Sequence, residues 1–221
     1  FGDSDKVKVG DVVYAMGSPA ALSQSVTRGI VSNTALIMSR FIGSMRLDGE
    51  TVGQLVRWIA HDAKIYGGNS GGPLVNEAGE IIGINEIGVA GLSGAIPSNL
   101  AESVADQLIA TGEVKRSWLG IDAQPLLKKD ADVQGVLVGG VIEGSPAEEA
   151  GMRPGDIILE YDGIPVQGRI PEDLPKFNAL VMSTPIATDV EIVAGRDGER
   201  KIYRPRTAIR DRAQGRDHEL K

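Results

Sequence analysis

The sequence predicts a mainly β protein built from two modules. Short apolar runs alternate with turn dipeptides along most of the chain, and glycine accounts for 29 of the 221 residues. Such runs, bounded by glycine and polar residues, are typical of strands in barrels and sandwiches. A polar stretch at 113–117 separates the modules and serves as a linker. We therefore expect two β-rich domains in one chain.

The first module is predicted to be a series of strands closed by a helix. Short strands at this spacing indicate a β-barrel, with a hairpin near its end. A helix follows, with Ser98 as the expected N-cap and Gly112 as its closing residue. Its apolar positions recur every fourth residue, at Leu100, Val104 and Leu108. The expected strands are 12–16, 25–32, 55–59, 74–76 and 81–85.

The second module is predicted to combine strands with two helices. The first is a compact helix at 145–151, with serine as N-cap, proline at its first position and glycine at its end. A strand at 156–161 and a second helix around 174–181 follow, before a closing hairpin. We place the first domain at residues 1–112, the second at 113–207 and a charged connector or tail at 208–221.

The composition excludes several functions. The formal net charge is −7 and no basic block is long enough to follow a phosphate backbone, so nucleic acid is not an expected partner. No run approaches the ~18 apolar residues of a membrane span. The absence of cysteine excludes disulfides, thiolate metal sites and a cysteine nucleophile. The acidic pairs lack the spacing of a calcium loop, so we expect neither a metal nor a cofactor.

The segment 67–75 carries the strongest chemical signal. It places Ser70 among four glycines and leads directly into an apolar strand. Glycine lets the backbone turn sharply, so that N–H groups can point at a developing oxyanion. The same residues fit the nucleophile elbow of α/β-hydrolases, but that motif needs a helix after the serine, and here a strand and a hairpin follow. We interpret Ser70 as an acylating nucleophile, with a glycine-rich turn carrying an incidental serine as the alternative.

A serine nucleophile needs a base, and the chain contains only two histidines. His61 lies nine positions before Ser70, at a strand end, and His218 lies in the charged tail. Nothing in the spacing brings either imidazole to the serine hydroxyl. We therefore interpret His61 as a structural residue and expect the base elsewhere.

The segment 67–76 resembles the active-serine segment of trypsin-like proteases in the form found in the HtrA (DegP-like) family. Other stretches of the first module resemble that family in the same order, and the second module resembles the PDZ domain that follows in it. The stretches are 3–5, 9–11, 15–19, 27–32, 62–63, 83–85 and 95–99, then 118–121, 144–147, 150–151 and 153–158. The resemblance implies the C-terminal β-barrel half of a trypsin-like protease domain, followed by a PDZ β-sandwich with two helices.

The resemblance also implies a function, that of a serine endopeptidase acting on unfolded or misfolded polypeptides through an acyl-enzyme at Ser70. The N–H groups of Gly68 and Ser70 are expected to form the oxyanion hole. Asn85, Glu86 and Ile87 are expected to pair with the substrate as a strand. The base histidine and its aspartate lie in a first barrel, upstream of Phe1, so the chain alone is expected to be inactive. A catalytically dead peptide-binding scaffold is the alternative.

In the PDZ-like module, Leu119, Gly120 and Ile121 correspond to the loop that receives a peptide C-terminal carboxylate. Phe177 and Leu180 are expected either to line the peptide pocket or to pack in the core. The expected partners are polypeptide substrates and peptide C-termini, and the family further implies a trimer-based homo-oligomer and a periplasmic or cell-envelope location. The chain departs from the family at the shorter loop 86–94, where Gly94 stands in place of the usual Phe.

Overall fold

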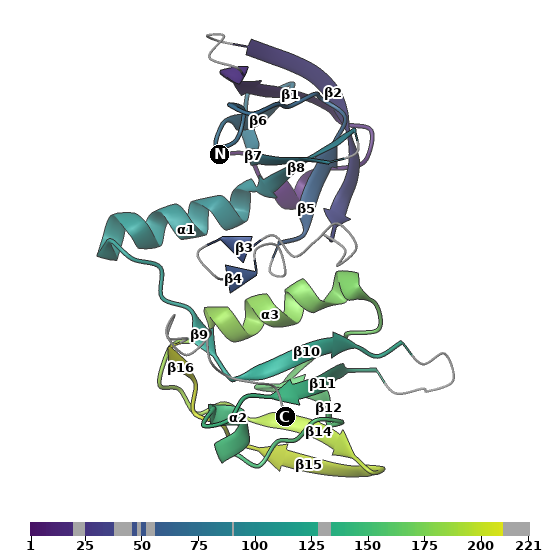
Figure 1. Ribbon diagram of the computed structural model, residues 1–221, viewed down its shortest axis with the longest axis vertical. Coiled ribbons are helices and arrows are strands. Elements are labelled where there is room, and N and C mark those ends of the chain that lie inside the picture. Colours follow the sequence, from purple (N-terminus) through teal and green to yellow (C-terminus); the bar gives the residue numbers. More distant parts are fainter. Residues whose placement is uncertain are drawn as a thin grey trace. The chain divides into compact units, whose positions relative to one another are not determined.

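The computed structural model describes residues 1–19, 25–37, 46–47, 50–51, 56–89, 91–127 and 134–209 (Figure 1). The chain forms two compact units, Phe1–Met38 with Val56–Val114, and Ser39–Leu55 with Lys115–Lys221. Each unit has a hydrophobic core of its own. Most of the expected tail, including His218, lies outside the described residues.

Six antiparallel strands of the first unit close into a barrel in the order β1-β2-β5-β8-β7-β6, which confirms the mainly β prediction (Figure 1). Val13 and Ala15 of β1 are both fully buried, as expected for alternate residues of a strand with one face toward a core. The strand expected at 55–59 lies further along the chain, where β5 spans Trp58–His61. The barrel strands are β1 (Val12–Gly17), β2 (Ser25–Leu36), β5 (Trp58–His61), β6 (Pro73–Asn76), β7 (Ile81–Val89) and β8 (Leu92–Pro97). A separate two-stranded pair is formed by β3 (Arg46–Leu47) and β4 (Glu50–Thr51).

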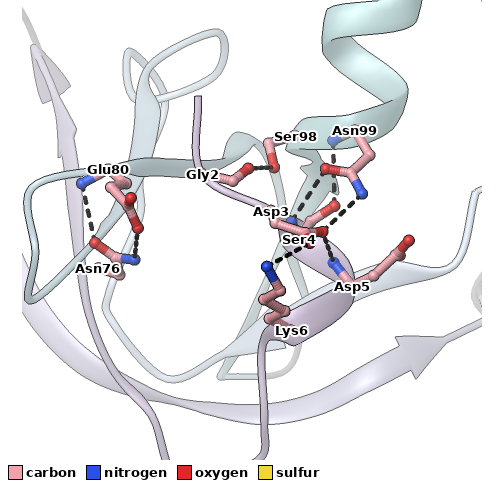
Figure 2. A network of polar contacts seen from close by, with 9 residues as sticks. All are labelled: Gly2, Asp3, Ser4, Asp5, Lys6, Asn76, Glu80, Ser98 and Asn99. Carbon is pink, nitrogen blue, oxygen red and sulfur yellow. Dashed lines mark hydrogen bonds and ion pairs between the residues drawn. The ribbon is translucent and has the colours of Figure 1, made fainter.

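The helix α1 (Ser98–Thr111) closes the first unit, and its N-terminus corrects one expectation (Figure 2). Pro97 is the N-cap and Ser98 is the first helical residue, and the Ser98 hydroxyl donates to the Gly2 carbonyl at 2.6 Å instead of capping the helix. The helical N–H of Asn99 is instead accepted by the hydroxyl of Ser4 at 3.1 Å, in the 3-10 turn η1 (Ser4–Lys6). The cap is thus supplied by a segment 95 residues away in the chain. Gly112 ends the helix in the left-handed conformation, as predicted.

Figure 2 shows how the N-terminal segment is tied to this helix. The Asn99 amide donates to the Asp3 carboxylate at 3.0 Å and its oxygen accepts from the Ser4 N–H at 3.1 Å. Asp3 also accepts from the Asp5 N–H and pairs with Lys6. The first residues are therefore an integral part of the barrel unit.

The second unit contains an antiparallel sheet in the order β10-β11-β12-β14-β15, with β13 paired to β12, and the helices α2 and α3 (Figure 1). Ser145 caps α2 by accepting from the Glu148 N–H, and Pro146 occupies its first position, as predicted. Asp197 and Gly198 both have positive φ, which is the backbone of a tight hairpin turn. The elements are β9 (Ser117–Trp118), β10 (Ile121–Pro125), β11 (Val136–Val141), α2 (Pro146–Glu149), β12 (Ile157–Tyr161), β13 (Ile164–Pro165), η4 (Pro171–Asp173), α3 (Leu174–Ser183), β14 (Ile192–Arg196), β15 (Glu199–Tyr203) and β16 (Ala208–Ile209).

A buried ion pair joins the loop before β12 to the end of β14. The carboxylate of Asp156 has no exposed side-chain surface and accepts from Nε and Nη2 of Arg196 at 2.5 and 2.7 Å. The same guanidinium donates to the Gly151 carbonyl and lies over the Tyr203 ring. These bonds satisfy a carboxylate that would otherwise be costly to bury.

Candidate active site

Ser70 lies in the loop that connects β5 to β6, which we call the serine loop (residues 62–72). Its side chain is exposed, and its hydroxyl donates to the Glu86 carbonyl at 2.9 Å. A backbone carbonyl does not remove a proton, so this bond orients the hydroxyl without activating it. The Ser70 hydroxyl is therefore accessible, but the Glu86 carbonyl does not deprotonate it.

The serine loop is fastened to β7 by main-chain hydrogen bonds. The Gly71 N–H donates to the Asn85 carbonyl at 2.8 Å, and the Asn85 N–H donates to the Gly72 carbonyl at 2.8 Å. These two bonds extend the β6–β7 pairing to the residues that precede β6. The two residues that follow Ser70 are thus held by β7, and this limits where Ser70 can lie.

Close backbone packing explains why this loop needs its glycines. A Cβ at Gly68 would lie 2.3 Å from the Ser18 carbonyl oxygen, and one at Gly72 would lie 2.1 Å from that of Met16. Gly68 also has a φ of +108°, which L side chains rarely adopt. The Ser18 N–H donates to the Gly68 carbonyl at 3.1 Å. The end of β1 therefore supports the loop from the side opposite to β7.

This folding leaves two N–H groups beside Ser70 available. Within the part of the chain that the structure describes, the N–H groups of Gly68 and Ser70 donate to no acceptor. Two free N–H groups next to an exposed hydroxyl form the kind of donor set that stabilises a tetrahedral oxyanion.

His61 lies at the end of β5 with no exposed surface, and among the described residues its side chain is hydrogen-bonded to Asn85 and not to Ser70. Its Nε2 is 3.1 Å from Oδ1 of Asn85, while Nδ2 of Asn85 donates to the Pro73 carbonyl at 2.9 Å. Because a carbonyl only accepts, the Asn85 amide orientation is fixed, and His61 must carry its proton on Nε2. His61 is thus a hydrogen-bond donor at this atom.

Burial lowers the pKa of His61 below its ordinary value of 6.5. The Asn85 side chain, the Ala63 backbone and the charge of Asp62 oppose this effect but do not outweigh it. A neutral imidazole that donates through Nε2 to an amide is not the base of Ser70. The prediction that His61 is structural agrees with this geometry, and the imidazole is fully buried.

Trp58 is a residue that sequence reasoning missed. Its indole is buried and packs against Gly94, where a Cβ would meet Trp58 Cε3 at an ordinary 3.5 Å. Gly94 on β8 therefore leaves the space that the indole occupies. Gly94 in place of the family's usual Phe is the sequence signal for this packing. The indole that packs there comes from Trp58 on the neighbouring strand β5.

The other predicted site residues lie in the second unit, at the start of the edge strand β10. Gly120 has a φ of +82°, and a Cβ there would lie 2.1 Å from Cβ of Ser145. The carbonyls of Leu119 and Gly120 accept from the N–H groups of Ala147 and Ile142. Among the described residues, the N–H groups of Leu119 and Gly120 donate to no acceptor. Both residues are buried, and they directly precede the sheet edge formed by β10.

Two side chains of α3, those of Phe177 and Leu180, are predicted either to line the peptide pocket or to pack in the core. Phe177 is 3% exposed and its ring lies edge-on to Tyr161 at 6.2 Å between centroids, so it belongs to the core. Leu180 is half-buried and packs against the same core. Trp118 is half-buried on β9.

Two family models match the chain. The trypsin-like peptidase domain matches residues 1–84 and the PDZ domain matches residues 137–193. A curated relative from Pseudomonas fulva, named probable periplasmic serine endoprotease DegP-like, is 40% identical over 216 residues. The match covers 92% of this chain but 42% of that protein. A relative of the same name from Rhizobium meliloti is 39% identical over 188 residues, which cover 80% of this chain and 34% of its own length.

Solved structures are also similar over nearly the whole chain. The HtrA-type protease AlgW with a tripeptide is 31% identical with a TM-score of 0.79, and the match covers 96% of this chain and 69% of AlgW. The serine endoprotease from Yersinia pestis is 30% identical with a TM-score of 0.65, covering 93% of this chain and 64% of that protein. The chain spans less than half the length of the curated relatives above.

Proposed function

Because the chain belongs to the HtrA (DegP-like) family of trypsin-like serine proteases with a PDZ domain, we propose that it forms part of a serine endopeptidase. Its substrates are unfolded or misfolded polypeptides, and its products arise through an acyl-enzyme at Ser70. The carrying observation is the exposed Ser70 hydroxyl beside the free N–H groups of Gly68 and Ser70. The curated relatives are named periplasmic, which supports a periplasmic location.

In the proposed reaction, the Ser70 oxygen attacks the scissile carbonyl while its proton passes to a histidine. The N–H groups of Gly68 and Ser70 hold the resulting oxyanion. The same histidine gives the proton to the leaving amine, and water then hydrolyses the acyl-enzyme. Since His61 donates to Asn85, this histidine and its aspartate are supplied from outside the described residues.

The substrate is proposed to pair with the segment 85–87 as an added strand. Both main-chain groups of Asn85 are already bonded to the serine loop. We therefore assign substrate pairing to the main chain of Glu86 and Ile87, with Glu86 releasing Ser70 when substrate arrives.

The PDZ domain is proposed to bind the C-terminal carboxylate of peptides through Leu119, Gly120 and Ile121. Free N–H groups at the start of an edge strand support this assignment. We further propose the domain limits 1–112 and 113–207, followed by a connector at 208–221. The compact unit that ends at Val114 supports the limit near residue 112. A trimer-based homo-oligomer is proposed from the family alone.

The second candidate is a catalytically dead peptide-binding scaffold. A fluorophosphonate, which acylates activated serines, separates the two. We would measure intact mass after labelling this chain, a form extended by its encoded upstream residues, and Ser70→Ala in both. An adduct on Ser70 in the extended form supports the protease. The lack of an adduct in both forms would sink it and leave peptide binding as the function.

A further inference from the structure

Asn85 connects His61 to the residues that follow Ser70, and both its main-chain groups and both its side-chain polar atoms take part in hydrogen bonds. It has no exposed surface. Its N–H and carbonyl bond to Gly72 and Gly71, its Nδ2 donates to Pro73, and its Oδ1 accepts from His61. Three of these four bonds therefore hold consecutive residues that follow Ser70.

The His61 imidazole is the donor that keeps this amide in place. Other polar groups around it are engaged elsewhere: Ser93 on β8 donates to the Ala63 carbonyl, and Asp62 accepts from the Ile30 N–H on β2. No other donor to Asn85 Oδ1 occurs among the residues that the structure covers. Removing the imidazole would leave a buried amide oxygen unsatisfied, which costs more than an average hydrogen bond contributes.

We infer that His61 and Asn85 are positioning residues that hold the serine loop in register with β7, and so fix the direction of the Ser70 hydroxyl and N–H. The catalytic part of this inference rests on the proposed function of Ser70. Neither residue touches the reacting atoms. Their effect passes through Gly71, the residue bonded to Ser70, and small misplacements at a nucleophile have large effects on rate.

Three replacements of His61 test this role. In His61→Gln, the side-chain amide nitrogen lies as many bonds from Cα as Nε2 of histidine does, so the donor to Asn85 is kept. In His61→Asn the amide nitrogen reaches only the level of Nδ1, and the donor is lost. His61→Leu removes all polar groups. The matched control is Ser93→Ala, which removes another buried hydrogen bond directly across from His61. That bond holds the serine loop at its first residues, at Ala63, and not at the residues 71–73 that follow Ser70.

The first measurement is amide hydrogen exchange in the 221-residue chain. The amides of Gly71 and Asn85 are compared with that of Ala15, which lies in the same barrel. We expect His61→Asn and His61→Leu to raise the two relative exchange rates about tenfold or more. His61→Gln should restore them, and Ser93→Ala should leave them unchanged. Unchanged rates in His61→Asn, or an equal rise in Ser93→Ala, would overturn the inference.

The second measurement is the rate of fluorophosphonate acylation in the form of the protein that reacts at Ser70. We expect His61→Asn to slow acylation about tenfold or more, with rescue by His61→Gln and a change of less than about twofold in Ser93→Ala. Equal slowing in Ser93→Ala would reduce His61 to a stabilising residue. If no form of the wild type is acylated, the proposed function fails, and hydrogen exchange alone still decides whether His61 positions the loop.

Discussion

Gly68 and Gly71 flank the Asn69-Ser70 pair, and both have positive φ, at +108° and +85°. Only Gly68 is also crowded, because a Cβ there would meet the Ser18 carbonyl at 2.3 Å, whereas nothing lies within 4 Å of one at Gly71. We expect Gly71→Ala to destabilise the chain by about 1–2 kcal/mol through backbone strain alone. Gly68→Ala should cost about 3 kcal/mol or more, because strain and steric overlap add.

Urea denaturation of the two glycine variants measures this difference. The matched positions share the loop and the sign of φ, so a difference in the free energy of unfolding isolates the contact with Ser18. Equal losses in both variants would show that the close approach of β1 to the loop contributes nothing.

His61 gives the chain a defined acid response. Its pKa is lowered in the folded state by burial, while in the unfolded chain it returns to about 6.5. As the pH falls below 6.5, the unfolded state therefore binds a proton that the folded state excludes, and stability decreases. The slope for one proton is at most about 1.4 kcal/mol per pH unit.

Carboxylates titrate as well, so the response of His61 is measured as a difference between wild type and His61→Gln. Unfolding free energies from urea titrations at several pH values between 8 and 5 give this difference. It should be constant above pH 7 and change below 6.5, in favour of the Gln variant. A constant difference across the whole range would contradict the lowered pKa.

At the scale of elements, the ion pair of Asp156 and Arg196 ties the loop before β12 to β14. Asp156 has no exposed side-chain surface and Arg196 is 18% exposed, so Arg196→Met leaves a buried carboxylate without its cation, with the Arg153 N–H still donating to it. We expect a loss of about 3 kcal/mol. The control is Arg206→Met, whose pair with Asp189 is 64% and 63% exposed and should change stability by less than about 0.5 kcal/mol. Thermal unfolding of both variants tests the contrast, and similar shifts in Tm would refute it.

Elements defined by local chemistry could be predicted from the sequence. The cap and proline of α2, the glycine end of α1 and the tight turn after β14 all depend on neighbouring residues. The N-terminus of α1 could not be predicted in the same way. Its N–H is capped by Ser4, and Ser98 serves as a donor to Gly2, so both roles depend on contacts between distant segments.

The candidate site divides along the same line. Ser70 and its glycines are contiguous, and the motif could be found in the sequence. The bonds of Asn85 to His61 and to the serine loop join β5, β7 and that loop, and no local sequence pattern predicts them. The packing of Trp58 on Gly94 is equally non-local.

At the scale of the whole molecule, two separate hydrophobic cores predict two unfolding events. The core around Val13 and Leu74 lies in the barrel unit, and the core around Ile158 and Phe177 lies in the PDZ unit. In differential scanning calorimetry, Gly68→Ala should lower one transition and Gly120→Ala the other. No helix among the described residues is long and apolar enough to cross a membrane.

The outcome of this calorimetry is discriminating because each variant acts as the control for the other. Gly120→Ala places a Cβ 2.1 Å from that of Ser145, deep in the PDZ unit. A single transition that either variant lowers would contradict this prediction, because it would show that the two units unfold as one cooperative body.

The closure of the barrel has a consequence for aggregation. A closed sheet has no full-length edge strand, so, apart from the segment of β7 proposed to pair with substrate, the open edges of the two main sheets in the described chain are β10 and β15 of the PDZ sheet. β15 carries Glu199, Arg200 and Lys201 in succession, and β10 ends at Pro125, which has no N–H to donate. Uncontrolled growth of the sheet is therefore opposed by charge on one border and limited in length on the other.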